Sequence, residues 1–144
     1  MIYRMGAAVL SLLGLFVSAY LYLYKIGRIG TLACGTGGCE TVQTSEWSRF
    51  LGVEVSLIGV VGYAVLLGVA LMALSTAADG RRWPTDLLTA LAAGGTAFAL
   101  YLTYLELFVI RAICRWCVGS AAIIISIFVL AVLARRHAPA PQAR

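Results

Sequence analysis

The chain has 144 residues, of which 62% are hydrophobic and 12% are charged, and its mean hydropathy is +0.95. Soluble domains are about half apolar and about one quarter charged, so this composition excludes both a water-soluble globule and a disordered chain. The formal net charge of +5 does not indicate nucleic-acid binding, because the basic residues flank apolar stretches, as they do in membrane proteins.

Four apolar stretches are each long enough to cross a bilayer as a helix, which takes about 20 residues. The expected spans are residues 5–26, 55–77, 87–110 and 112–134. Pro84, Thr85 and Asp86 precede the third span and are typical of a helix start. We therefore expect an all-α integral membrane protein, with a four-helix bundle over residues 1–137 and a disordered tail over residues 138–144.

A long connection, residues 27–54, follows the first span and contains six glycines and two cysteines. Loops of this length in a compact domain are usually functional. Within the connection, residues 44–51 (TSEWSRFL) place Trp47, Phe50 and Leu51 at helical spacing behind a capping Thr or Ser. This pattern predicts a short amphipathic helix at the membrane surface.

The orientation follows from the positive-inside rule, which here compares six basic residues on the side of the chain ends with five on the other side. We place both ends in the cytoplasm. The long first connection then lies on the periplasmic or extracellular side of the inner (plasma) membrane.

The four cysteines form two close pairs, Cys34 with Cys39 in the first connection and Cys114 with Cys117 at the start of the fourth span. An even number of spans places both pairs on one side of the membrane. The second pair shares a helix face, where the helix N-terminus and two neighbouring arginines stabilise a thiolate. The first pair closes a glycine-rich loop, which makes it mobile and open to attack. Together the pairs indicate a thiol–disulfide relay.

Other interpretations of the cysteines are apolar filling, structural disulfides and a four-thiolate zinc site. Neither apolar filling nor structural disulfides explain why both cysteine pairs lie on the same side of the membrane. The apolar sequence around Cys114 and Cys117 differs from a zinc knuckle, so we expect no metal.

A relay needs a final electron acceptor. The sequence contains neither a dinucleotide-binding fingerprint nor a haem attachment motif, and its one histidine, His137, precedes the tail. The two-electron acceptor dissolved in a bilayer is a quinone, and a quinone-coupled membrane enzyme keeps the bacterial periplasm oxidising. We therefore expect ubiquinone or menaquinone among the helices beside Cys117. Trp47 and Phe50 are candidates to cover it, or are interfacial anchors.

Three stretches of the chain resemble the vitamin K epoxide reductase family, in particular its bacterial quinone-linked members. They are Cys39-x5-Ser45-x-Trp47, Ser56-Leu57-Ile58-Gly59 with Tyr63, and Tyr101-Leu102 leading to Cys114-Arg115-Trp116-Cys117. The resemblance covers nearly the whole chain and implies a four-helix membrane oxidoreductase that oxidises thiols with a quinone.

The resemblance also implies roles for individual residues. Cys117 would react with the quinone, and Cys114 would exchange with Cys39. Cys34 would meet a reduced thioredoxin-like partner protein, and Ser45 would lie over the quinone. Because only eight residues remain from His137 onward, we expect the partner to be a separate protein. We also expect the chain to act as a monomer.

Two positions depart from the vertebrate enzyme of that family. Val55 replaces an asparagine and Ala121 replaces a tyrosine, and both vertebrate side chains are associated with vitamin K recognition. We therefore expect thiol oxidation by a quinone rather than epoxide reduction.

Two rival functions fit the same four spans. The disulfide bond formation protein B family also has two cysteine pairs, but its second pair lies in a long outer loop. A small transporter or assembly factor would keep the cysteines structural and use Glu106 as a coupling carboxylate. The plainer interpretation of Glu106 is that it reaches the interface or pairs with a nearby arginine.

Small and hydroxylated residues in the spans have packing explanations. Gly59-x-x-Gly62 and Gly94-Gly95 allow close approach of helices. Ser75, Thr89, Thr96 and Thr103 are expected to donate hydrogen bonds to carbonyls of their own helices.

Overall fold

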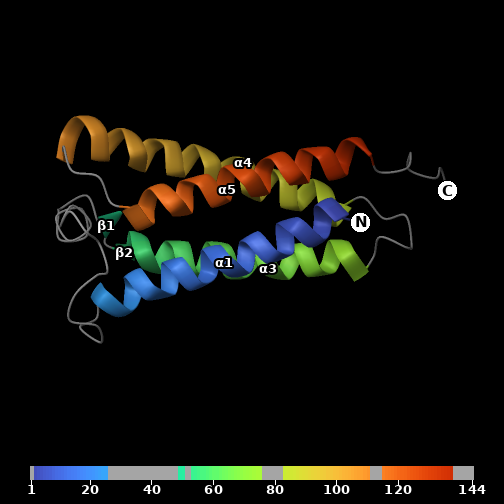
Figure 1. Cartoon of the computed structure of the whole chain (residues 1–144), viewed down its shortest axis with the longest axis horizontal. Helices are drawn as coiled ribbons and strands as arrows, with labels where there is room; N and C mark the ends of the chain where they lie inside the picture. Colours follow the sequence, from blue (N-terminus) through green and yellow to red (C-terminus); the bar gives the residue numbers. More distant parts are fainter. Residues whose placement is uncertain (1, 26–48, 51–52, 76–82, 111–114, 138–144) are drawn as a thin grey trace.

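The computed structural model describes residues 2–25, 49–50, 53–75, 83–110 and 115–137. Within these ranges, four long helices lie side by side along one axis (Figure 1). They are α1 (Ile2–Lys25), α3 (Val55–Ser75), α4 (Trp83–Tyr104), which the π-helical segment η3 (Leu105–Ile110) continues, and α5 (Arg115–Arg136). All four are long and apolar enough to cross a membrane, so the predicted fold class is confirmed.

The third helix differs most from its predicted span. It begins at Trp83 rather than at residue 87, because Pro84 fits the first helical turn, where no intrahelical partner is needed for its missing N–H. The last six residues of the predicted span, Leu105–Ile110, form the π-helical segment η3 rather than α-helix. Residues 111–114 and the predicted tail, residues 138–144, lie outside the described part of the chain.

The predicted surface helix over residues 44–51 is wrong at its C-terminal end. Strand β1 (Arg49–Phe50) pairs antiparallel with strand β2 (Val53–Glu54), and the Cα partners are Arg49 with Glu54 and Phe50 with Val53. Only Leu51 and Gly52 separate the strands in sequence, and a glycine in so short a connection favours a hairpin over a helix. Residues 44–48 lie outside the described ranges. The hairpin leads directly into α3.

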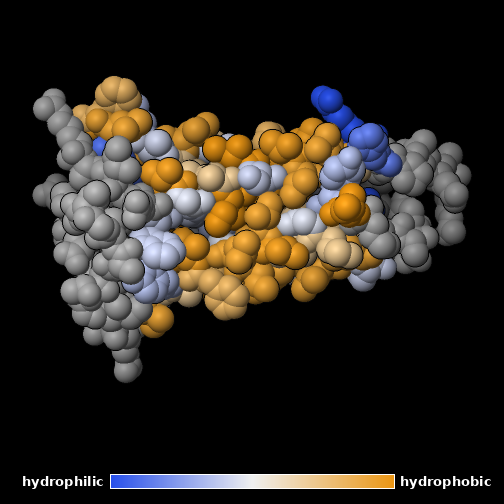
Figure 2. Space-filling model, viewed as in Figure 1, coloured by the Kyte–Doolittle hydropathy of each residue, from blue (hydrophilic) through white to orange (hydrophobic). Residues whose placement is uncertain are grey.

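Small side chains bring the helices together. α1 packs closely on both α3 and α5, and α5 also packs on α4, whereas α3 and α4 are the least closely packed neighbours. Four alanines in the common core are completely buried: Ala7, Ala70, Ala92 and Ala131. Small residues allow the close backbone approach on which helix association in lipid depends. The outer face is largely hydrophobic (Figure 2), as a lipid-facing surface must be.

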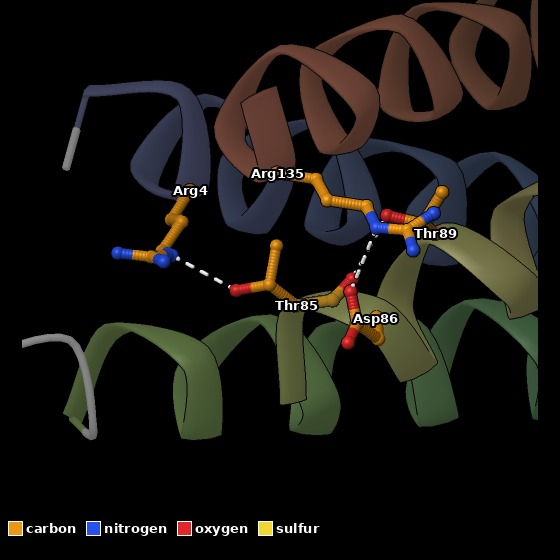
Figure 3. A network of polar contacts seen from close by, with 5 residues as sticks. All are labelled: Arg4, Thr85, Asp86, Thr89 and Arg135. Carbon is orange, nitrogen blue, oxygen red and sulfur yellow. Dashed lines mark hydrogen bonds and ion pairs between the residues drawn. The ribbon is translucent and has the colours of Figure 1, made fainter. Parts of the chain in front are cut away.

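Polar contacts close the end of the bundle where α1 begins and α5 ends (Figure 3). The buried Arg4 donates from Nε to Thr85 Oγ1 at 3.1 Å, which ties α1 to the first turn of α4. Arg135 Nε lies 2.9 Å from Asp86 Oδ1 and joins α5 to the same turn. This ion pair is about half exposed and contributes little energy, so its effect is on the position of α4.

Most of the hydroxyl groups behave as predicted. Thr89 and Thr103 donate to the carbonyls four residues earlier at 2.8 Å, and Ser75 donates to Met72 O at 3.0 Å. The expectation for Thr96 is wrong, because its Oγ1 is buried without a hydrogen-bond partner. Threonine has two common rotamers in a helix and both can occur, so sequence alone does not decide which one is adopted.

Among the described glycines, Gly14 of α1 lies closest to a side chain of a neighbouring helix. A Cβ built at this position overlaps the ring of the buried Tyr63 in α3. We predict that Gly14→Ala lowers the free energy of unfolding by about 1–3 kcal/mol, because a rigid buried ring has to move. Thermal unfolding in detergent measures the change.

Gly68→Ala in α3 is the matched control, because nothing lies within 4 Å of a Cβ at Gly68. It should stabilise the protein by up to about 1 kcal/mol through helix propensity. Equal stability of the two variants would contradict the close contact.

Candidate quinone-binding site

A cavity of about 510 Å³ lies where α3 and α4 are least closely packed. Its volume is within the range of small-molecule sites, roughly 300–1,000 Å³. Along α3 it extends from Val55 to Leu66, about 16 Å at the helical rise per residue. The helix starts of α3 and α5 lie at the same end of the bundle, so the cavity begins at the end that carries Cys117 (Figure 1).

The cavity is open to the outer face of the bundle. Four of its lining residues are also exposed, namely Gly62 and Val65 of α3 and Ala90 and Gly94 of α4. These residues face the surface that lipid covers in a membrane-spanning bundle. A lipid-soluble molecule can therefore enter from the side without crossing water.

Glycines provide much of this space. A Cβ at Gly62 or Gly94 meets nothing within 4 Å, and both residues line the cavity. Their partners in the two predicted packing motifs behave differently. A Cβ at Gly59 would lie 2.7 Å from Ser18 Oγ, and one at Gly95 would lie 3.0 Å from Ile124 Cδ1. The packing interpretation is thus correct for Gly59 and Gly95, whereas Gly62 and Gly94 keep the cavity open.

Polar groups gather at the cysteine end of a mostly apolar wall. Cys117, in the first turn of α5, is partly buried and lines the cavity. Ser56, in the first turn of α3, is buried, and its Oγ has no hydrogen-bond partner. A ligand there meets a thiol and a hydroxyl at one end and apolar side chains along the rest of its length.

Glu106 also lines this end of the cavity and is only 4% exposed. The expectation that it reaches the interface is wrong. The other expectation, an ion pair of Glu106 with Arg111 or Arg115, involves arginine side chains that lie outside the described part of the chain. Glu106 belongs to the π-helical segment, and such segments frequently occur at functional sites.

Tyr63 crosses the bundle from α3 to α5 and forms part of the cavity wall. Its hydroxyl donates to Ser120 O at 2.8 Å and lies at the same distance from Ser120 Oγ. The ring occupies the slot left by Gly14 of α1. These contacts hold the first turns of α5, and with them Cys117, against α3.

An aromatic contact anchors the start of α5 from the other side. The rings of Trp116 and Tyr20 lie 5.0 Å apart between centroids and are tilted by 48°. Trp116 is next to Cys117 in sequence, so this contact to α1 restricts the helix turn that carries the thiol.

The other predicted site residues lie outside the described part of the chain: Cys34, Cys39, Ser45, Trp47 and Cys114. Phe50 is described only as a member of β1. Within the described ranges, no group of three or more His, Cys, Asp or Glu side chains is able to hold a metal ion.

The family model of the vitamin K epoxide reductase family matches residues 6–132. The chain belongs to this family. Members of the vitamin K epoxide reductase family are membrane oxidoreductases of disulfides and quinones, so the protein is a multi-pass membrane oxidoreductase. The match includes all of α3 and α4, most of α1 and α5, and the whole cavity wall.

Val55 and Ala121 are the two positions at which the sequence is expected to depart from the vertebrate enzyme. Val55 and Ala121 both line the cavity. The cavity therefore has apolar side chains at both of these positions.

Three features of this wall differ from what the sequence predicts. The motif around Ser56 does not indicate an unpartnered hydroxyl, and the glycine motifs predict packing rather than open space at Gly62 and Gly94. The position of Ser56 directly after the start of an apolar span was the available signal, because a serine there lacks a helical carbonyl four residues earlier. No sequence signal separates a glycine that packs from one that leaves space.

Proposed function

We propose that the protein is a thiol:quinone oxidoreductase that generates disulfides. A reduced thioredoxin-like partner delivers electrons to Cys34 and Cys39, which pass them to Cys114 and Cys117 and on to a membrane quinone. The observation that carries this proposal is the position of Cys117 in the wall of an apolar, laterally open cavity.

The proposed reaction conserves electrons and protons. At each exchange, one dithiol becomes a disulfide while another disulfide becomes a dithiol. In the last step the Cys114 and Cys117 sulfurs form an S–S bond, and two electrons and two protons reduce the quinone to the quinol. The chain positions the thiols and excludes water, whereas the quinone supplies the oxidising power.

The cavity fits a quinone in size, polarity and access. Its cysteine end offers Ser56 Oγ and the Cys117 thiol to the head group. The apolar wall along α3 and α4 suits an isoprenoid tail, and the exposed lining residues provide a route from the lipid. The apolar Val55 and Ala121 favour a quinone over the epoxide substrate of the vertebrate enzyme.

The proposed site of action is the periplasmic or extracellular face of the plasma membrane. The four cysteines belong on that face if the chain ends are cytoplasmic, and this compartment permits stable disulfides. In this proposal the chain acts as a monomer.

Replacement of Cys117 tests the proposal directly. We predict that Cys117→Ala abolishes quinone reduction, because no other described side chain of the cavity can transfer electrons to the ring. The assay contains the purified full-length protein, a reduced thioredoxin-like substrate and a short-chain ubiquinone analogue, and it follows quinone absorbance.

Gly119→Ala is the control on the same helix, since a Cβ there meets nothing within 4 Å. It should retain wild-type turnover. Undiminished quinone reduction by Cys117→Ala would refute the proposed electron route and favour a protein with structural cysteines.

Narrowing the cavity provides an independent test. We predict that Gly62→Leu and Gly94→Leu each raise the KM for the quinone analogue about tenfold, equivalent to about 1.4 kcal/mol of binding. The added side chains enter space that the ligand would occupy, and the gain in helix propensity protects the fold.

Gly68→Leu is the matched control in α3. Gly68 is exposed and has open space at its Cβ, as Gly62 does, but it does not line the cavity. An equal rise of KM in the control would mean that the substitutions act through the membrane surface rather than through the cavity.

A further inference from the structure

Ser56 has a hydroxyl group that the protein itself does not satisfy. The residue is 8% exposed, its Oγ is completely buried, and no hydrogen-bond partner is present for it. Buried hydroxyl groups nearly always have a partner, because burial removes the hydrogen bonds they make with water. The unpartnered Ser56 Oγ therefore needs an explanation.

The place of Ser56 in α3 explains why no backbone group satisfies it. Other hydroxyls in the bundle donate to the carbonyl four residues earlier: Ser11 to Ala7, Thr89 to Thr85, Thr103 to Ala99 and Ser126 to Ala122. α3 begins at Val55, so the residue four positions before Ser56 precedes the helix. The hydroxyl therefore has no carbonyl of its own helix in that position.

Ser56 begins the stripe of α3 that lines the cavity. Gly59, Tyr63 and Leu66 follow it on the same helix face, at helical spacing. Cys117 begins the corresponding stripe of α5, which continues through Ser120 and Ile124. Because α3 and α5 start at the same end of the bundle, the hydroxyl and the thiol share one end of the cavity (Figure 1).

We propose that Ser56 Oγ donates the hydrogen bond that fixes one carbonyl oxygen of the quinone and holds the ring against Cys117. This inference rests on the proposed function and names a binding residue for its electron acceptor. Ser56 keeps its own proton, while the two thiols supply the two electrons. The quinone oxygen gains negative charge during reduction, and hydrogen bonds to charged acceptors are stronger. Ser56 should therefore aid turnover as well as binding.

The test compares Ser56→Ala with Thr96→Val. Thr96 Oγ1 is also buried without a partner in a membrane-spanning helix, but Thr96 does not line the cavity. Both substitutions remove an unpartnered hydroxyl, so both should leave the thermal unfolding temperature unchanged or higher. Only Ser56→Ala should lower kcat/KM for the ubiquinone analogue, by about tenfold, whereas Thr96→Val should match the wild type.

Three further measurements exclude a purely structural effect. Ser56→Thr keeps the hydroxyl and should restore most of the quinone activity lost in Ser56→Ala. The infrared carbonyl band of the bound analogue should shift to higher frequency in Ser56→Ala, because a carbonyl that accepts no hydrogen bond has a stiffer C=O bond. Oxidation of the thiol partner in a single turnover without quinone should be the same in all variants.

The outcomes separate this inference from the proposed function. Wild-type kcat/KM and an unshifted carbonyl band in Ser56→Ala would overturn the role of Ser56 while leaving the oxidoreductase intact. An equal loss of activity in Thr96→Val would also overturn it, because any buried hydroxyl would then have the same effect. A wild-type protein that reduces no quinone would overturn the proposed function and this inference together.

Discussion

Close contact of α1 with α3 and α5 is the constraint on which the rest of the structure depends. Lipid provides no hydrophobic driving force between helices, so association depends on packing at short distance. Gly14 accepts the ring of Tyr63, and Gly59 of α3 lies against Ser18 of α1. α4 is held mainly by α5 and by contacts at the far end of the bundle. The looser contact between α3 and α4 leaves room for the cavity.

The same arrangement explains how an apolar bundle can support thiol chemistry. The cavity is apolar along most of its length, and its polar groups are concentrated at the end where α3 and α5 begin. Tyr63 bonds to Ser120, and Trp116 packs on Tyr20, so the helix turn of Cys117 is held from two sides. A thiol fixed at the end of a lipid-accessible cavity suits electron transfer to a membrane-soluble acceptor better than it suits a structural role.

Membership of the vitamin K epoxide reductase family does not decide the substrate of this chain. Val55 and Ala121 give the cavity wall apolar side chains, and Ser56 brings an unpartnered hydroxyl next to Val55. Glu106 adds a buried carboxyl group to the same end. Ser56, Glu106 and Cys117 therefore line the end of the cavity that would receive the head group of a ligand.

The amino-acid sequence accounts for the four-helix membrane fold, because about 20 consecutive apolar residues have no other stable arrangement in a bilayer, and its cysteine motifs also point to the family. It did not predict the β1–β2 hairpin, since the spacing of Trp47, Phe50 and Leu51 fits a helix and only strand pairing shows otherwise. Only the packing of the four helices established that Gly62 and Gly94 leave space and that Glu106 is buried. Each of these properties depends on which atoms of the other helices lie nearby, and the pattern along one helix does not contain that information.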